Sequence, residues 1–204
     1  LNLTIPHKVE VFSLLDTIDP EARNIGAVNT LKFDGLKWQG FNSDGYGLEH
    51  ALLGKLEVPL ISANVVVLGA GGAARAAAAQ ALSRGCKSLW IGNRSTHRLK
   101  ELIGELRNSF DTSCVTTFEI SQIPSALFKI EELVIINATA LGLEKDDPSP
   151  VSLLDFPSST KIYDMIYNPP ETSLLKQAKL MGMACENGLS MLVHQAVRSL
   201  SIWT

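Results

Sequence analysis

The sequence predicts an α/β fold built around a parallel sheet that carries helices on both faces. A buried-strand run, Val65 to Leu68, leads into a glycine-rich turn and then into an alanine-rich helix that ends at Gly85. Further strand-like runs occur in "KSLWIGNR", "SCVTTFEI", "ELVIINATA" and "TKIYDMIYNPP", and "STHRLKELIGELRNSF" between the first two has helical periodicity. Strands that alternate with helices are typical of parallel sheets covered on both faces.

The first 44 residues have a different pattern. Two short predicted strands, Val28 to Phe33 and Lys37 to Gly40, flank an Asp34-Gly35 turn, which is a hairpin signal. A hairpin does not belong to a series of parallel strands and crossover helices. We therefore expect a small first domain that precedes a nucleotide-binding type of domain, and a surface loop at residues 144–152.

Composition excludes several classes of protein. A chain of 204 residues, 46% hydrophobic and 19% charged, is long enough to bury a core as one ordinary domain or two small ones. A net charge of −3 argues against a broad nucleic-acid-binding face. The chain has no apolar run of the roughly 18 residues that a membrane helix needs, no recognisable signal segment and no initiator Met. We expect a soluble, cytoplasmic protein.

Neither cysteines nor histidines are spaced like metal ligands. Cys86, Cys114 and Cys185 are odd in number, widely separated and without a CxxC pair. This spacing predicts three reduced thiols rather than a disulfide framework or a zinc site. The histidines are His7, His50, His97 and His194, and they too suggest no metal site.

The glycine-rich turn predicts a dinucleotide-binding site. Gly69, Gly71 and Ala74 fit the pattern G-x-G-x-x-G/A between a strand and a helix. The first glycine permits the tight turn, the second lets the backbone approach a pyrophosphate, and the small third residue allows close packing of helix on sheet. The alternative is a tightly packed turn that binds no ligand.

The end of the second strand indicates which dinucleotide is bound. NAD sites usually carry Asp or Glu there to hold the ribose 2′-hydroxyl, whereas this chain has Asn93, Arg94 and Ser95, with Arg98 one turn further on. A guanidinium pairs with a 2′-phosphate through charge-assisted hydrogen bonds. We therefore predict NADP, with Arg94 a stronger candidate than Arg98, which also fits an ordinary solvated helix residue.

A reductase needs a proton donor beside the hydride path, and Lys8 and Asp44 are candidates. Lys8 comes shortly after Pro6, which would rigidify its approach, and Asp44 lies between glycines in "GFNSDGYG". A lysine can shuttle the proton of an alcohol–ketone conversion when its pKa is tuned. Burial would lower that pKa and a carboxylate would raise it, so spacing alone leaves open whether the two residues are surface charges.

Seven segments in order resemble the shikimate dehydrogenase family along nearly the whole chain. They are "NLTIPHK", "GAVNT", "GFNSDGYG", "GAGGAARA", "NRS", "YDMIYNP" and "NGLSMLVHQA". The resemblance implies NADPH-dependent reduction of 3-dehydroshikimate, a step towards chorismate and the aromatic amino acids. It also implies a Rossmann-like, doubly wound NADP domain beside a smaller α/β substrate domain, with the active site in the cleft between them.

The resemblance also implies the roles of individual residues. Lys8 and Asp44 would form the catalytic pair, with Lys8 giving or taking the hydroxyl proton. Substrate contacts would come from Thr4, Asn29, Asp44, Tyr167 and Gln195. Cofactor contacts would come from Gly69, Ala70, Gly71, Gly72, Ala73, Asn93, Arg94, Ser95, Arg98, Met165 and Gly188. Nothing in the sequence gives His7 a role, and we expect it to be structural.

Family members normally carry further residues ahead of the "NxTxPxK" stretch, with a Ser-x-Ser element that grips the substrate carboxylate. We therefore expect a complete NADP domain at residues 45–187 and an incomplete substrate domain at residues 1–44 and 188–204. Strands around "LNLTI" would then lack neighbours and leave edge groups unpaired. "NATALGL" departs slightly from the family pattern, with little expected consequence.

Two other functions stay open. One is a quinate/shikimate dehydrogenase with broader choice of substrate or cofactor, although the two arginines favour NADP. The other is a non-catalytic relative that senses a ligand, which loss of Lys8 or Asp44 would mark; both residues are present. The expected partner is a small-molecule substrate, without nucleic acid or membrane, and a homodimer stays open as the assembly.

Overall fold

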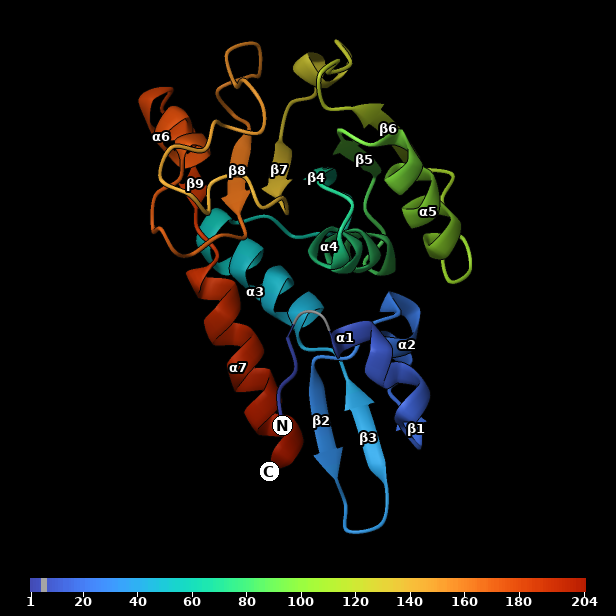
Figure 1. Ribbon diagram of the computed structural model, residues 1–204. Coiled ribbons are helices and arrows are strands. Elements are labelled where there is room, and N and C mark those ends of the chain that lie inside the picture. The colour runs from blue at the N-terminus through green and yellow to red at the C-terminus, as the bar shows by residue number, and fades with distance from the viewer. Residues whose placement is uncertain (5–6) are drawn as a thin grey trace.

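The computed structural model describes residues 1–4 and 7–204 and contains two sheets (Figure 1). The larger sheet has six parallel strands in the order β6-β5-β4-β7-β8-β9. They are β4 (Asn64–Leu68), β5 (Ser88–Asn93), β6 (Val115–Glu119), β7 (Leu133–Asn137), β8 (Lys161–Asp164) and β9 (Cys185–Glu186). This is the doubly wound order of dinucleotide-binding folds. The five predicted strands are confirmed, whereas β9 was not predicted.

Both faces of this sheet are buried, which explains its continuous apolar strands. Successive side chains of a strand point to opposite faces, so Val65 and Val67 enter one core while Val66 and Leu68 enter the other. Helices α3 (Asp44–Leu56), α4 (Gly72–Ser83) and α5 (Thr96–Leu106) cover the first face. The second face is covered by α6 (Ser173–Leu180), the short helix η2 (Leu127–Lys129) and the loop at residues 151–156.

The smaller sheet contains the predicted hairpin. Strands β2 (Thr30–Phe33) and β3 (Trp38–Phe41) pair antiparallel, and β1 (Thr17–Ile18) pairs parallel with β3. The turn is held by the Asp34 carboxylate, which accepts from the backbone N–H groups of Leu36 and Lys37 at 3.0 and 2.8 Å. Helix α2 (Pro20–Ile25) packs beside this sheet.

The opening residues pair with β2 on one side. The Leu3 N–H donates to Asn29 O and the Leu31 N–H donates to Leu1 O, each at 2.8 Å, so residues 1–3 run antiparallel beside β2. The chain then forms helix α1 (His7–Glu10) and the short helix η1 (Val11–Leu14). Pro6, to which we assigned a rigidifying role, lies outside the described residues.

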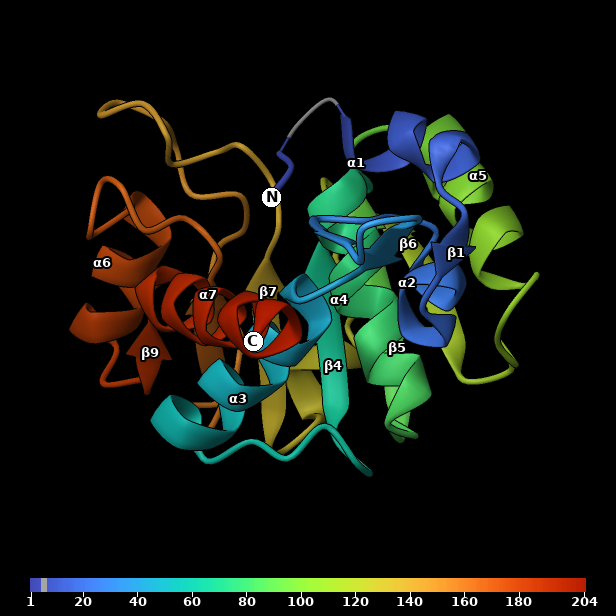
Figure 2. The same cartoon turned by 90° about the horizontal axis from the view of Figure 1, so that it is seen from below.

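Two packed helices connect the sheets. Helix α3 leaves the small sheet at Asp44 and leads to β4, and helix α7 (Leu189–Trp203) follows β9 and returns to the small sheet (Figures 1 and 2). They approach closely because Gly47 has no side chain: a Cβ there would lie 2.7 Å from the Met191 carbonyl oxygen. The far end of α7 is fastened by the Trp203 indole N–H, which donates to Leu31 O at 2.8 Å.

Within the described part of the chain, no helix is long and apolar enough to cross a membrane. The outer face of α7 exposes apolar side chains, among them Leu189, Val193, Val197 and Leu200.

A buried carboxyl group marks the end of β8. Asp164 is fully buried, accepts from Thr172 Oγ1 at 2.6 Å, and receives the Asn137 amide and the Ile166 N–H at 3.0 and 3.1 Å. Burial raises the pKa of Asp164 above its ordinary value, and the hydrogen bonds oppose that rise. The folded state therefore keeps this proton to higher pH than the unfolded state does.

This linkage predicts the pH dependence of an Asp164→Asn variant. As pH rises from the ordinary pKa to the raised pKa, wild-type protein loses the stability tied to this proton, whereas the variant has no such proton to lose. The stability of the variant relative to wild type should therefore rise with pH across that window. Urea unfolding between about pH 4 and pH 8 measures this difference; parallel curves would contradict the assignment.

Candidate active site

The predicted catalytic pair is an ion pair in this structure. Lys8 Nζ, on α1, lies 2.7 Å from Asp44 Oδ2, and their side chains are 28% and 17% exposed. Asp44 is the first residue of α3, where the helix N-terminus stabilises a negative charge. Its own N–H donates to Asn42 Oδ1 at 2.9 Å, and Asn42 is anchored by donating to Ala27 O.

Asn29 holds the second oxygen of this carboxylate. Its Nδ2 donates to Asp44 Oδ1 at 2.8 Å and to Ser43 Oγ at 3.0 Å, while its Oδ1 accepts from the Ser43 N–H at 2.8 Å. Every hydrogen-bonding group of the Asn29 amide thus has a protein partner, and the residue is only 2% exposed. Asn29 fixes the orientation of Asp44 from behind.

Ser43 was missed by the sequence analysis. It occupies the N-cap position of α3, but its hydroxyl makes no capping bond, because Asn42 takes that role. The Ser43 hydroxyl instead contacts Gln195 Oε1 at 3.2 Å. In the described residues Gln195 Nε2 has no partner, so both of its N–H groups are available to a ligand. A serine just before Asp44 was the signal that could have indicated this contact.

Lys8 and Asp44 line the same cavity as the helix after the glycine turn. This cavity has a volume of about 370 Å³. The cavity is lined from the small-sheet side, from α4, from the residue after β8 and from α7. In that order the lining residues are Lys8, Val9, Ala27, Asn42 and Asp44, then Gly72, Ala73, Arg75 and Ala76, then Met165 and Met191. Five residues predicted for catalysis or cofactor binding (Lys8, Asp44, Gly72, Ala73 and Met165) are therefore brought to one space.

The glycine turn has the geometry that a pyrophosphate site needs. Gly69 has φ +118°, and a Cβ there would lie 2.8 Å from Ala138 O, so packing alone requires glycine. At Gly71 the backbone is extended and a Cβ would meet nothing within 4 Å, so open space faces it. Helix α4 begins here without a side-chain cap, which leaves its first N–H groups free for an anion.

This turn also lies at the topological switch point. Strand β4 pairs with β5 on one side and β7 on the other, so the chain order reverses beside Gly69. Ligands of open parallel sheets bind at such points. Ala74, the third residue of the pattern, is fully buried against the sheet, as predicted.

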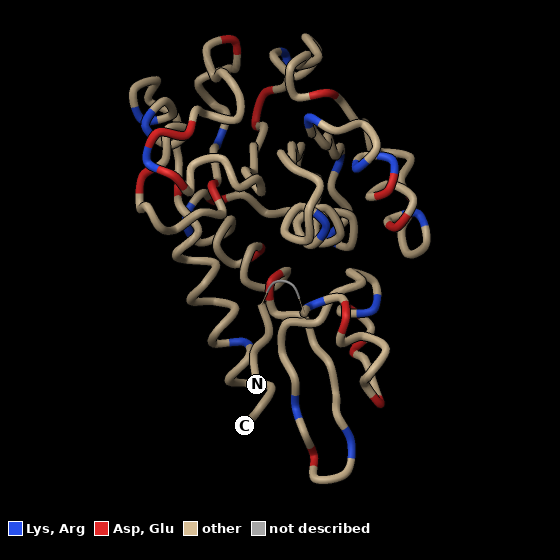
Figure 3. Tube along the Cα trace, viewed as in Figure 1, with Lys and Arg blue, Asp and Glu red and all other residues tan. Residues whose placement is uncertain are grey.

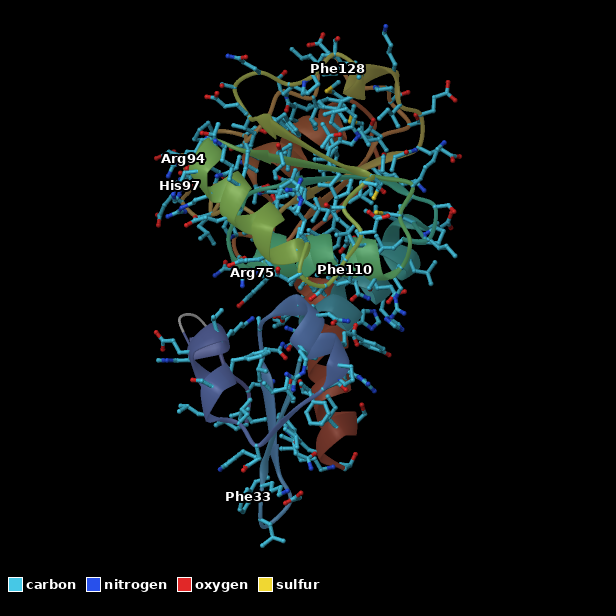
Figure 4. All side chains as sticks on the ribbon, turned by 90° about the vertical axis from the view of Figure 1, so that its right-hand side faces the viewer. Phe33, Arg75, Arg94, His97, Phe110 and Phe128 are labelled. Atoms are coloured by element: carbon cyan, nitrogen blue, oxygen red, sulfur yellow. The ribbon has the colours of Figure 1, made fainter. Side chains whose placement is uncertain are left out.

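The basic residues after β5 lie at the surface. Ser95 caps α5 by accepting from the Arg98 N–H at 3.4 Å, and Asn93 Nδ2 donates to Ser95 O at 3.1 Å. Arg94 and Arg98 are exposed, and Arg94 lies at the carboxyl end of β5, beside His97 (Figure 4). Among the described residues Arg94 has no ion-pair partner. Arg98 and Ala70 line one groove of about 390 Å³, which also contains Glu101 and Glu105. The contact of Arg94 and Arg98 with a 2′-phosphate stays a prediction.

Of the remaining predicted residues, Gly188 lies next to Met165, whereas Thr4 and Tyr167 lie outside the cavity lining. A Cβ on Gly188 would overlap the Met165 carbonyl, and the Gly188 N–H donates to Ile166 O at 3.1 Å, so the two predicted nicotinamide neighbours are adjacent. Thr4 is exposed and Tyr167 is half-exposed, and neither belongs to the cavity lining given above. Their substrate contacts stay predictions.

Among the described residues, neither the charged side chains nor the cysteines form a second candidate site. Lys and Arg are interspersed with Asp and Glu along the trace (Figure 3). Residues 1–4 and 7–204 contain no cluster of three or more His, Cys, Asp or Glu that could hold a metal ion. The three cysteines are free, although Cys86 and Cys114 are neighbours, which together with burial raises the pKa of Cys86 to about 12.

The two turn glycines predict different defects. Gly69→Ala should lower the free energy of unfolding by about 1–3 kcal/mol, because it forces a positive φ on alanine and a clash with Ala138 O. Gly71→Ala should leave stability unchanged but weaken NADPH binding, because its Cβ would enter the open space. Denaturant unfolding and fluorescence titration separate these outcomes; equal loss of stability in both variants would contradict the account.

Comparison with known proteins agrees with this architecture. The shikimate dehydrogenase substrate binding domain family matches residues 1–31, and the shikimate / quinate 5-dehydrogenase family matches residues 53–142. A relative from Geobacter metallireducens, named Shikimate dehydrogenase (NADP(+)), is 37% identical over the whole chain, which covers 71% of that relative.

Solved structures give the same result. Shikimate 5-dehydrogenase from Thermus thermophilus, in complex with NADP(H) and shikimate, matches with TM-score 0.84 and 33% identity over 100% of this chain and 72% of its own. Quinate dehydrogenase from Corynebacterium glutamicum, in complex with NAD, matches with TM-score 0.90 and 28% identity over 100% of this chain and 72% of its own. Because these sequence matches extend over the whole of this chain, the chain belongs to the shikimate dehydrogenase family.

Proposed function

We propose that this protein catalyses the reversible, NADPH-dependent reduction of 3-dehydroshikimate to shikimate. The observation that carries the proposal is the cavity shared by the Lys8–Asp44 ion pair and the free N-terminus of α4. A proton donor and a dinucleotide site must meet at one space for a carbonyl to be reduced. Family membership supports the substrate.

The proposed role of Lys8 is general acid. NADPH, when bound, supplies the hydride to the carbonyl carbon. Lys8 Nζ gives a proton to the carbonyl oxygen as that oxygen becomes a hydroxyl, and it regains a proton from solvent. In the oxidation direction neutral Lys8 accepts the same proton. Asp44 holds Lys8 in position, with 2.7 Å between Asp44 Oδ2 and Lys8 Nζ.

Substrate hydroxyl groups would be held from the small-sheet side. Gln195 offers two free N–H groups, Asp44 offers carboxylate lone pairs, and Asn29 keeps Asp44 in orientation. Thr4 and Tyr167 are proposed as further substrate contacts on the strength of the family resemblance. A shikimate-type ligand carries several hydroxyl groups, which suits such a mixed set of donors and acceptors.

The cofactor would lie along the carboxyl ends of β4 and β5. The Gly69–Ala73 turn would bind the pyrophosphate, and Arg94 and Arg98, with Asn93 and Ser95, would bind the 2′-phosphate. Met165 and Gly188 would border the nicotinamide. We further propose residues 45–187 as the NADP domain, and residues 1–44 with 188–204 as the substrate domain; the two separate sheets support this division.

A quinate/shikimate dehydrogenase with broader specificity is the second candidate, favoured by the structural similarity to a quinate dehydrogenase. Rates with shikimate and quinate, each with NADP and NAD, distinguish the two. The non-catalytic alternative is disfavoured because Lys8 and Asp44 are present and paired. A cytoplasmic location and the absence of a nucleic-acid partner are proposed from the sequence alone, which leaves a homodimer open as the assembly.

Lys8→Ala tests the proton step. Turnover of 3-dehydroshikimate should fall by about 10²- to 10⁴-fold, because the general acid is lost. NADPH should still bind, because its proposed contacts lie at the six-stranded sheet. Lys37→Ala, which removes an exposed lysine of the hairpin, serves as the control and should retain wild-type turnover. Parallel loss of turnover and NADPH binding would show that Lys8 is structural.

Arg94→Ala tests the choice of cofactor. NADPH affinity should fall at least about tenfold, since charge-assisted hydrogen bonds to the 2′-phosphate are lost, while NADH affinity should change little. Lys100→Ala on α5 is a control for simple loss of an exposed positive charge. Dissociation constants from nicotinamide fluorescence give the answer, and equal losses for both cofactors would remove Arg94 as the selectivity residue.

A further inference from the structure

Helix α7 has an unusual buried residue. Its side chains are largely apolar, yet the one buried residue within its fully described span is Ser199, which is completely inaccessible. A buried hydroxyl costs free energy unless it is hydrogen-bonded. Ser199 Oγ lies 2.8 Å from Thr30 Oγ1, 3.1 Å from Ser43 Oγ and 3.1 Å from Asn2 Nδ2.

The supply of protons assigns a direction to these contacts. Thr30 Oγ1 donates to Asn29 Oδ1 at 2.9 Å, so its single proton is used. Asn29 Oδ1 also accepts the Ser43 N–H, which fills its two lone pairs. The Ser43 hydroxyl lies 3.2 Å from both Asn29 Oδ1 and Gln195 Oε1. Because Asn29 Oδ1 already has two donors, we assign the Ser43 proton to the Gln195 amide oxygen, which only accepts.

Ser199 therefore lies at the start of two chains of hydrogen bonds. With the Thr30 and Ser43 protons committed, the single Ser199 proton is shared between Thr30 Oγ1 at 2.8 Å, its shorter contact, and Ser43 Oγ at 3.1 Å, and the Ser199 oxygen accepts from Asn2. One chain runs through Thr30 to Asn29 and ends on the Asp44 carboxylate. The other runs through Ser43 to Gln195. Hydrogen bonds in such chains polarise one another.

The helical geometry adds a second link. Gln195 and Ser199 are four residues apart in α7 and so lie on the same face, and both reach Ser43 Oγ, at 3.2 and 3.1 Å. Ser199 thereby sets how far α7, and with it Gln195, lies from the start of α3, where Asp44 is located. It lines none of the cavity itself.

We infer that Ser199 is a positioning residue, which orients Gln195 and the Asn29–Asp44 pair for the hydroxyl groups of the substrate. This inference rests on the proposed function, because it names what that site needs in order to hold its substrate. It assigns Ser199 no contact with substrate or cofactor.

Ser199→Ala in the 204-residue chain provides the test. KM and Kd for shikimate should rise by roughly three- to tenfold, the loss expected for one buried hydrogen-bond donor, with a smaller change in kcat and an unchanged Kd for NADPH. Ser199→Thr, which keeps the hydroxyl, should restore most of the affinity. Ser201→Ala, an exposed serine of the same helix, is the matched control and should behave as wild type.

A double-mutant cycle with Gln195→Ala adds a readout that general destabilisation would not move. In the Gln195→Ala background the effect of Ser199→Ala on shikimate affinity should be smaller, because the chain of hydrogen bonds from Ser199 through Ser43 to Gln195 is already broken. An unchanged shikimate Kd in Ser199→Ala, or an equal loss of NADPH and shikimate affinity, would overturn the inference alone. Wild-type protein that binds NADPH but not shikimate would overturn the proposed function, and the inference with it.

Discussion

The Lys8–Asp44 ion pair is the interaction on which the rest of the site depends. Asp44 comes shortly after β3 of the hairpin sheet and is the first residue of α3, the helix that leads to the nucleotide-type sheet. Its two oxygens take different donors, Lys8 on one and Asn29 on the other, so the carboxylate cannot rotate freely. The pair is therefore held at the boundary between the two sheets, where the cavity opens.

Contacts between helices, and not strand pairing, hold the two sheets in position relative to each other. Helices α3 and α7 pack side by side, and the absence of a side chain at Gly47 permits their close approach. A buried polar layer at Ser43 and Ser199 then fixes one helix against the other. Because polar groups require specific partners, this layer selects one alignment of α7, whereas apolar contacts alone would tolerate sliding.

The sequence predicted the larger sheet better than it predicted the hydrogen-bonded residues around Asp44, such as Ser43 and Ser199. The turn at Gly69 and the strand at Val65 to Leu68 have strong local signals, whereas β9 is only two residues long and has no periodicity to detect. The Lys8–Asp44 pairing came from family resemblance and not from spacing. The Ser43–Ser199 contact joins residues 156 positions apart, so no local pattern indicates it; only the folded chain brings these hydroxyl groups together.

Transfer of deuterium tests the central claim that one cavity joins the proton donor to the hydride donor. NADPH labelled with deuterium at the reactive carbon of the nicotinamide would be mixed with 3-dehydroshikimate and protein, and the product examined by mass spectrometry and NMR. The account predicts shikimate with the label on the carbon that bears the new hydroxyl group, and far less labelled shikimate from the Lys8→Ala variant within the same reaction time. Wild-type protein that binds both ligands but yields no labelled shikimate would contradict it.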